Sequence, residues 1–263
     1  MKKLLTLSTA LLFLLAPSVG QKKKGQQEAP AKKTISTFTE GMQKFEGYFD
    51  FYWDEKKGKI FLHIDKWDQE FLYVNSLAAG VGSNDIGLDR GQLGEDRVVK
   101  FQKHGPKALL IQPNQDYRAV SENNDEVKSV QEAFASSTIG GFKIELQEAG
   151  SALVDITSFL LQDSHRVSER LKRTKQGTYS IDAARSTVYM PGTMNFPENT
   201  EFESILTFKG TPQNNWITSV TPSPRAVTVR THHSFIKLPD DDYEPREFDP
   251  RGAFGGITYQ DYA

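Results

Sequence analysis

The 263-residue chain contains no cysteine. It therefore cannot form a disulfide bond, a thiolate metal site or a thiol nucleophile. It also lacks a Gly-x-Ser-x-Gly nucleophile elbow, a Gly-x4-Gly-Lys-Ser/Thr phosphate loop and a pair of histidines four residues apart with an adjacent glutamate. The sequence thus assigns no catalytic residue to this chain, and whether the chain is an enzyme stays open.

A basic patch is also missing from most of the chain. The first 34 residues carry seven lysines and one glutamate, which leaves 25 basic and 33 acidic residues, a net charge of −8, from residue 35 onward. Nucleic-acid binding needs Lys and Arg to neutralise phosphates, so this acidic excess argues against a nucleic-acid partner. Beyond the N-terminus no apolar run approaches the roughly 20 residues of a transmembrane helix, so no membrane span is expected.

The N-terminal segments predict an exported protein. Two lysines precede the leucine-rich run Leu4–Ala16, and Ser18 and Gly20 supply small residues where a signal peptidase cleaves. Residues 1–20 are therefore predicted to be a signal peptide, and the mature protein is expected to be secreted or periplasmic. The lysine- and glutamine-rich stretch that follows is predicted to be a disordered linker over residues 21–37.

Alternation of apolar and polar residues predicts strands in most of the remaining chain. Phe49, Phe51 and Trp53 form the first such run. Further strands are predicted at 60–64, 71–76, 97–103, 108–112, 142–146, 152–156, 185–190, 201–209, 216–220 and 226–236. Short consecutive strands joined by turns are typical of an antiparallel sheet.

Helical spacing of apolar residues occurs in only two places, residues 126–136 and residues 158–172, the second with a break near Asp163. The predicted fold class is therefore α+β, with a predominantly antiparallel β-sheet and two or three short helices. Two folded units are predicted: a small antiparallel β unit over residues 38–78 and a larger β-rich α+β domain over residues 79–263.

One long glycine-rich connection, residues 79–94, is a candidate binding loop. It contains five glycines together with Asn84, Asp85, Asp89 and Arg90. Glycines permit close approach of the backbone to a ligand, and long connections are often functional. The alternative is a surface loop that Asp89 and Arg90 tie to the rest of the domain.

The adjacent histidines His232 and His233 are the candidate metal ligands, with the acidic residues 240–242 shortly downstream. They lie in the predicted strand 226–236, where neighbouring side chains point to opposite faces. His233 then shares the apolar face with Phe235, and His232 lies beside Arg230, which would repel a cation. The alternative to metal binding is a pair of packed or hydrogen-bonded histidines.

Several sequence strings resemble one protein family. They are GYFDFYWDEK (47–56), EFLYVNSLAAG (70–80), GSNDIGLDRGQL (82–93), FLLQD (159–163), NTEFE (199–203), VTVRTHHSF (227–235) and GITYQDYA (256–263). They resemble the N-terminal region of exported bacterial zinc-dependent metalloproteases of metzincin type, which begin with two uncharacterised modules. The resemblance covers roughly residues 40–263 and implies a β-rich fold followed, outside this chain, by a catalytic domain with an extended three-histidine zinc motif.

The resemblance implies a function but transfers no catalytic residue, since none has a matching position here. The chain is expected to be a non-catalytic region that supports or positions a C-terminal protease domain of the same longer polypeptide. Zinc is implied only for that catalytic domain, and no cofactor is expected in this chain. The aromatic C-terminal segment 254–263 is expected to pack against another surface. The alternative is a stand-alone extracytoplasmic module that binds peptide or glycan.

Overall fold

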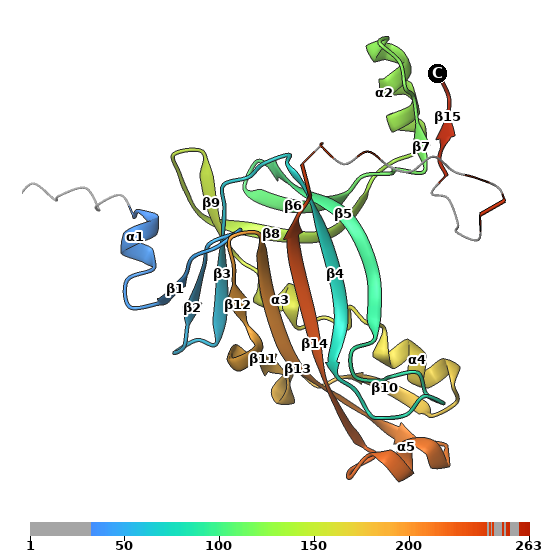
Figure 1. Cartoon of the computed structure of the whole chain (residues 1–263). Coiled ribbons are helices and arrows are strands. Elements are labelled where there is room, and N and C mark those ends of the chain that lie inside the picture. The colour runs from blue at the N-terminus through green and yellow to red at the C-terminus, as the bar shows by residue number, and fades with distance from the viewer. Residues whose placement is uncertain (1–32, 241, 243, 245–248, 250, 253–257) are drawn as a thin grey trace, which may run out of the picture. The chain divides into compact units, whose positions relative to one another are not determined.

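The computed structural model describes residues 33–240, 242, 244, 249, 251–252 and 258–263 (Figure 1). The predicted signal peptide and most of the predicted linker lie outside these residues. The described chain contains a 13-stranded antiparallel sheet, a separate two-stranded sheet, five short α-helices and two 3-10 helices. It is therefore β-rich with a large antiparallel sheet, as the alternation predicted.

The elements follow the chain in this order. The strands are β1 (Gln43–Phe45), β2 (Phe51–Asp54), β3 (Lys59–Ile64), β4 (Glu70–Ala79), β5 (Leu93–His104), β6 (Lys107–Gln112), β7 (Tyr117–Arg118), β8 (Ser137–Glu148), β9 (Ser151–Asp155), β10 (Gly177–Ile181), β11 (Thr187–Val188), β12 (Met194–Asn195), β13 (Asn199–Pro212), β14 (Ala226–Lys237) and β15 (Gln260–Asp261). The helices are α1 (Ile35–Phe38), α2 (Asn124–Ala133), α3 (Thr157–Leu160), α4 (Val167–Arg173), α5 (Asn215–Val220) and the 3-10 helices η1 (Ala183–Arg185) and η2 (Met190–Gly192).

The large sheet has the strand order β1-β2-β3-β9-β8-β6-β5-β4-β14-β13-β10, and β11 and β12 also pair with β13. Figure 1 shows the long strands β13, β14, β4 and β5 side by side. The segment between β1 and β2 is hydrogen-bonded to the turn between β12 and β13. Asn195 Nδ2 donates to the carbonyl oxygens of Phe45 (3.0 Å) and Phe49 (2.9 Å), and Tyr48 N donates to Phe196 O at 2.8 Å. The sheet therefore curls until its first strands meet the edge of β13 at β12.

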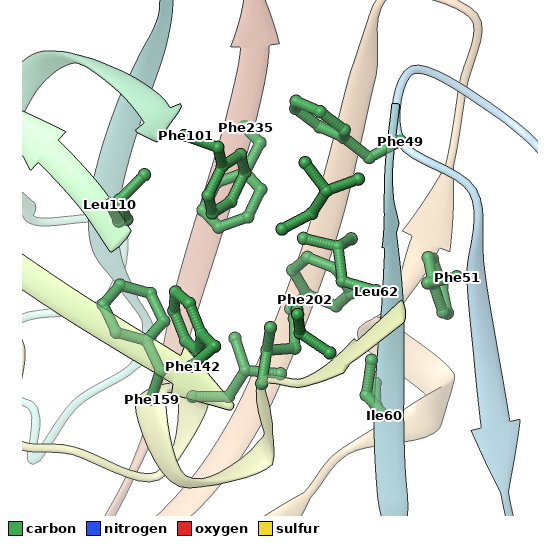
Figure 2. Close-up of a cluster of buried hydrophobic side chains, with 14 of the residues drawn as sticks. Phe49, Phe51, Ile60, Leu62, Phe101, Leu110, Phe142, Phe159, Phe202 and Phe235 are labelled. Carbon is green, nitrogen blue, oxygen red and sulfur yellow. The ribbon is translucent and has the colours of Figure 1, made fainter. Parts of the chain in front are cut away.

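The main core fills the concave side of this curled sheet and is dominated by phenylalanine (Figure 2). Phe235 of β14 lies near its centre. Its ring centroid is 5.3 Å from that of Phe71, 5.6 Å from that of Phe202 and 6.3 Å from those of Phe49 and Phe101. All five side chains are almost completely buried. Because the chain has no disulfide, burial of this aromatic cluster supplies the main cohesion of the sheet.

Two smaller clusters complete the interior. One lies where α4, α5 and the glycine-rich loop cover the sheet, and it includes Ile86, Leu171 and Ile217. The other lies on the opposite face of β3 and β9, where Ile35 packs with Phe61 and Leu153. Apolar residues of the connections, and not only those of the strands, therefore help to build the interior.

Five α-helices are present in the described chain, more than the two or three expected. The strand predicted at 216–220 is wrong, because α5 occupies this segment. Lys209 pairs with Ala226, so the intervening residues must reverse direction within one connection. Ile217 is buried there, and its backbone N–H donates to Gln176 Oε1 at 3.1 Å. These tertiary contacts override the β propensity of the segment.

Folded structure also begins earlier than predicted, at α1 and not at Phe38. Thr34 and Thr37 form a capping box, in which each side chain accepts from the other's backbone N–H. Ile35 N also donates to Glu148 Oε2 at 2.9 Å. The linker prediction missed this helix because it relied on composition and gave no weight to the capping residues.

Strands from the two predicted units pair directly with one another. In the large sheet β3 pairs with β9, and β4 pairs with β5 on one side and β14 on the other. Both predicted units also contribute side chains to the phenylalanine core. The division into two folded units at residue 78 therefore stays a prediction from the sequence.

The core makes a specific prediction about stability. Phe235→Ala should lower the free energy of unfolding by about 3–5 kcal/mol, because it removes the ring that contacts most of the aromatic cluster. Phe196→Ala is the matched control, since Phe196 is 42% exposed and its loss should change stability by about 0.5 kcal/mol or less. Urea unfolding followed by tryptophan fluorescence measures both, and equal effects of the two substitutions would contradict the assignment of the core.

Candidate functional site

The glycine-rich connection is an ordered loop held by its apolar residues. Val81, Ile86 and Leu88 are buried in the cluster that also contains Leu171 of α4. The loop closes on itself through hydrogen bonds from Val81 N to Leu88 O (2.9 Å) and from Gly87 N to Ser83 O (3.0 Å). Gly87 has φ +72°, a conformation that favours glycine, and it lies against the guanidinium of Arg170.

The four polar residues proposed from the sequence as binding residues are not gathered into a site. Asn84, Asp85 and Arg90 are exposed, and Asp89 is half-buried. Within the described residues none of these four side chains takes part in a hydrogen bond or an ion pair. Asp89 and Arg90 therefore do not tie the loop down, and the buried apolar side chains do so instead.

A cleft of about 220 Å³ lies beside this loop, between the start of β5 and helix α4. It is lined by Asn75 of β4, by Leu93, Gly94 and Glu95 of β5, by Ser164, His165 and Arg166, and by Glu169, Arg170 and Arg173 of α4. None of the four polar residues named from the sequence, Asn84, Asp85, Asp89 and Arg90, lines this cleft, and their role in binding stays a prediction. The lining residues come from three distant segments, so no single motif or periodicity indicates the whole set.

Asn75 is the buried polar residue of the cleft. The pairing of β4 with β5 changes register between Val74 and Ser76, which leaves Asn75 in a β-bulge. Asn75 is 1% exposed, its Nδ2 donates to Ser164 O at 3.0 Å, and its Oδ1 lies 3.3 Å from His165 Nδ1. A Cβ atom at Gly94 would overlap Asn75 Oδ1, so glycine is required there. The bulge thus turns an amide toward the segment that precedes α4.

The arginines in and beside the cleft fall into two groups, those paired with Glu95 and those without an ion-pair partner. Arg166 pairs with Glu95 at 2.6 Å, and Arg97 pairs with the other oxygen of the same carboxylate. Arg166 has φ 55° and ψ 40°, a left-handed conformation that is costly for a non-glycine residue. Arg170 and Arg173 have no ion-pair partner among the residues that the structure describes. Two guanidinium groups of α4 thus remain available beside the cleft.

The first two backbone N–H groups of α4 already have acceptors. Asp163 Oδ1 accepts from Val167 N at 2.7 Å, and Asp163 Oδ2 accepts from Ser168 N at 2.9 Å. This side chain also explains the break near Asp163 between α3 and α4. Any anion bound in the cleft would therefore be held by side chains and not by the helix terminus.

His165 is a neutral group of the cleft near pH 7. Burial lowers the pKa of His165 below its ordinary value, and the positive charge of Arg170 lowers it further. The imidazole can therefore donate or accept a hydrogen bond there without adding to the charge of the cleft.

The two candidate metal ligands, His232 and His233, point to opposite faces of β14. His233 is completely buried beside Tyr73, whose hydroxyl lies 2.9 Å from His233 Nδ1. Burial lowers the pKa of His233 to about 4, and the neighbouring His232 adds to this effect. Burial also raises the pKa of Tyr73 to about 12, so both partners are uncharged near pH 7.

His232 belongs to an ionic network on the other face of β13 and β14. Its Nε2 lies 2.7 Å from Glu201 Oε2, and its Nδ1 lies 3.7 Å from Glu203 Oε2. The hydrogen bond to Glu201 raises the pKa of His232 against the opposing effect of burial. Burial would raise the pKa of Glu201, but hydrogen bonds from His232, Ser234 and Asn199 outweigh it and lower this pKa. Arg230 Nε is 3.0 Å from Glu203 Oε1, an ion pair that lacks hydrogen-bond geometry.

This network does not converge on a metal-binding point. The two nitrogens of the His232 ring face different carboxylates, and the second histidine lies on the far side of the strand. Among the described residues no group of three or more His, Asp or Glu side chains is arranged to hold a metal ion. Of the acidic residues 240–242 that lie shortly downstream, Asp241 lies outside the described residues. His232 and His233 are best explained as an ion-paired and a packed histidine.

A second surface feature is an aromatic face formed by α2, β7 and β15. The rings of Tyr117 and Phe134 are stacked with centroids 4.1 Å apart, and Tyr262 lies 5.2 Å from Phe134. Arg118 lies over the ring of Tyr259 at 4.2 Å. Tyr259 and Tyr262 are nevertheless 47% and 51% exposed. A groove of about 490 Å³, lined in part by Tyr117 and Phe134, adjoins this face.

The two neighbouring histidines should make the free energy of unfolding depend on pH in opposite ways. The folded-state pKa of His233 lies near 4, below its ordinary 6.5, so the unfolded chain binds this proton first as pH falls. The protein should therefore lose about 3 kcal/mol between pH 7 and pH 4 through His233. The pKa of His232 is raised instead, so its stabilising contribution is present below pH 6.5 and is lost as pH rises through its folded-state pKa.

Urea unfolding of two variants across pH 4–9 tests both signs. His233→Phe should flatten the loss of stability on the acid side, whereas His232→Gln should cost most near pH 6 and least near pH 9. Parallel pH profiles for the wild type and both variants would show that neither pKa is shifted as described.

Within the described residues no helix has both the length and the apolar character needed to cross a membrane.

Comparison with protein-family models gives two matches: a domain of unknown function, DUF5118, over residues 32–80, and another, DUF5117, over residues 91–263. Neither description names an activity or a link to metzincin proteases. No curated protein and no solved structure matches the chain. Because the second model covers more than half of its length, the chain belongs to the DUF5117 family of domains of unknown function.

Proposed function

We propose that this chain is an exported, non-catalytic module that supports or positions a zinc metalloprotease domain outside it. The proposal rests on the strings within residues 40–263 that resemble the N-terminal region of metzincin-type proteases. In this proposal the zinc ion and the catalytic residues belong to the protease domain, and the secreted or periplasmic location follows from the predicted signal peptide.

The observation that best supports a docking role is the aromatic face of α2, β7 and β15. Tyrosine is enriched in interfaces because its ring offers a large contact area and its hydroxyl stays hydrogen-bonded. Tyr259 and Tyr262 are held by the contacts with Arg118 and Phe134, yet about half of each side chain is exposed. Burial of these surfaces under a neighbouring domain would gain apolar contact at little cost in side-chain entropy.

The groove beside the aromatic face suits the same role. Its lining includes the apolar side chains of Leu109 and Ile111 and the polar side chains of Lys100, Gln102 and Gln131. A mixed lining of apolar and polar side chains is typical of the contacts between domains.

The gene provides the most direct test of the proposal. The reading frame is expected to continue past the Ala263 codon into a domain with an extended three-histidine zinc motif. Nucleotide sequencing of the locus measures this outcome. A stop codon immediately after Ala263, with no protease domain encoded in frame, would contradict the proposal.

Hydrogen exchange tests the docking surface itself. In a polypeptide that includes the protease domain, backbone amides of α2 and β7 should exchange more slowly than in the present chain alone, because the neighbouring domain covers them. Amides of α5 serve as the internal control, since α5 also exposes an aromatic residue, Trp216, but lies outside the proposed face. Unchanged exchange in α2 and β7 would show that the protease domain docks elsewhere, if at all.

The alternative function is that of a stand-alone module that binds peptide or glycan. One specific observation favours peptide, namely the cleft that contains Arg170 and Arg173. Guanidinium groups recognise carboxylates, which a peptide with a free carboxyl terminus carries and a neutral glycan does not.

A further inference from the structure

We propose that the cleft between the start of β5 and helix α4 binds a carboxylate group of a peptide. Arg170 and Arg173 would hold the carboxylate, and Asn75 and His165 would form the inner wall of the site. The inference does not depend on association with a protease domain, and its failure would leave the proposed docking role untouched.

The two arginines are placed to act together. Arg170 and Arg173 are three residues apart on α4, so their side chains leave the same side of the helix. Val167 and Leu171 of the same helix are completely buried, which fixes the helix against the sheet. The nearby arginine Arg166 is already engaged by Glu95, so Arg170 and Arg173 supply the available charge.

The charge of the cleft favours a singly charged ligand. Its lining carries Arg166, Arg170 and Arg173 against Glu95 and Glu169, a net charge of +1. A carboxylate, with one negative charge, neutralises this excess. A phosphate group, with about 1.5 to 2 negative charges at pH 7, would exceed the net charge of the lining and would meet the carboxylate of Glu169.

The size of the cleft limits the ligand to a small group. Its volume of about 220 Å³ lies below the roughly 300–1,000 Å³ of pockets that enclose whole small molecules. It therefore has room for one terminal residue of a peptide and not for an extended segment. A carboxyl terminus satisfies both limits, because it presents a single charge at the end of the chain.

The inner wall of the cleft is arranged in advance of binding. Asn75 is fixed by the β-bulge and by its bond to Ser164 O, and Gly94 leaves the space that the amide occupies. Arg166, whose backbone is left-handed, connects Ser164 and His165 of this wall to the first residue of α4. A strained residue and a bulge on either side of one cleft are features that cluster at binding sites.

A titration with matched peptides tests the proposal. The probes are the acetylated tripeptide Ac-Ala-Ala-Ala with a free carboxyl terminus, the same peptide with a carboxyl-terminal amide, and inorganic phosphate. Changes in backbone amide NMR signals at low ionic strength measure binding to the whole chain. The free-carboxylate peptide should give saturable shifts at residues 93–95 and 164–173, and the amide peptide should bind roughly tenfold more weakly or not at all.

Single substitutions locate the site. Arg170→Gln and Arg173→Gln should each weaken binding of the free-carboxylate peptide roughly tenfold. Lys172→Gln is the matched control, because it removes the same charge from the same helix at an exposed position that does not line the cleft. Binding in this control should stay within about twofold of the wild type. Arg173 is also exposed, so its variant keeps the test valid if Arg170→Gln disturbs folding.

Four results would overturn the proposal. They are the absence of saturable binding by the free-carboxylate peptide, equal binding of the amide peptide, tighter binding of phosphate than of the peptide, and equal effects of Lys172→Gln and Arg173→Gln. The third result would show an anion site of different chemistry, and the fourth would show attraction by the general charge of α4.

Discussion

The alternation of side chains along β14 is the constraint on which the rest of the structure depends. This strand pairs with β13 on one side and β4 on the other, so each of its side chains must enter the core or the outer face. Phe235 and His233 point inward, and His232 and Arg230 point outward. A shift of one residue would bury the ionic side chains and expose the aromatic ones. The register of the sheet is therefore fixed by the large energetic difference between these two arrangements.

The same constraint explains why the two adjacent histidines have opposite chemistry. His233 loses its proton readily because a buried charge has no compensating partner beside Tyr73. The pKa of His232 is raised instead, because Glu201 is within hydrogen-bond distance on the outer face. Residue type alone would make the pair a candidate metal site, whereas the strand geometry separates the two rings. The position of each ring on the sheet, and not its proximity in sequence, decides its role.

Much of the sheet is predictable from the sequence because period-two alternation reflects burial directly. Segments such as 60–64 and 226–236 carry this pattern in consecutive residues. The helix α5 was not predictable in this way, since its conformation depends on contacts of Ile217 with distant residues. The cleft is also formed by distant segments, and the bulge at Asn75 exists only in the paired strands. The one sequence signal that could have indicated it is the spacing of Arg166, Arg170 and Arg173 on a predicted helix.

Strand β5 connects the two proposed binding surfaces. It begins at Leu93–Glu95 in the cleft and ends at His104, which lines the groove beside the aromatic face. Nine residues of extended strand span roughly 30 Å. β5 pairs with β4 from Leu93 to Lys100 and with β6 from Lys100 to His104, so backbone pairing holds it in the sheet from one end to the other. The two surfaces are therefore linked by one continuously paired strand. A peptide end bound in the cleft would be held at a constant distance from a domain docked on the aromatic face, which is the geometry that a positioning module requires.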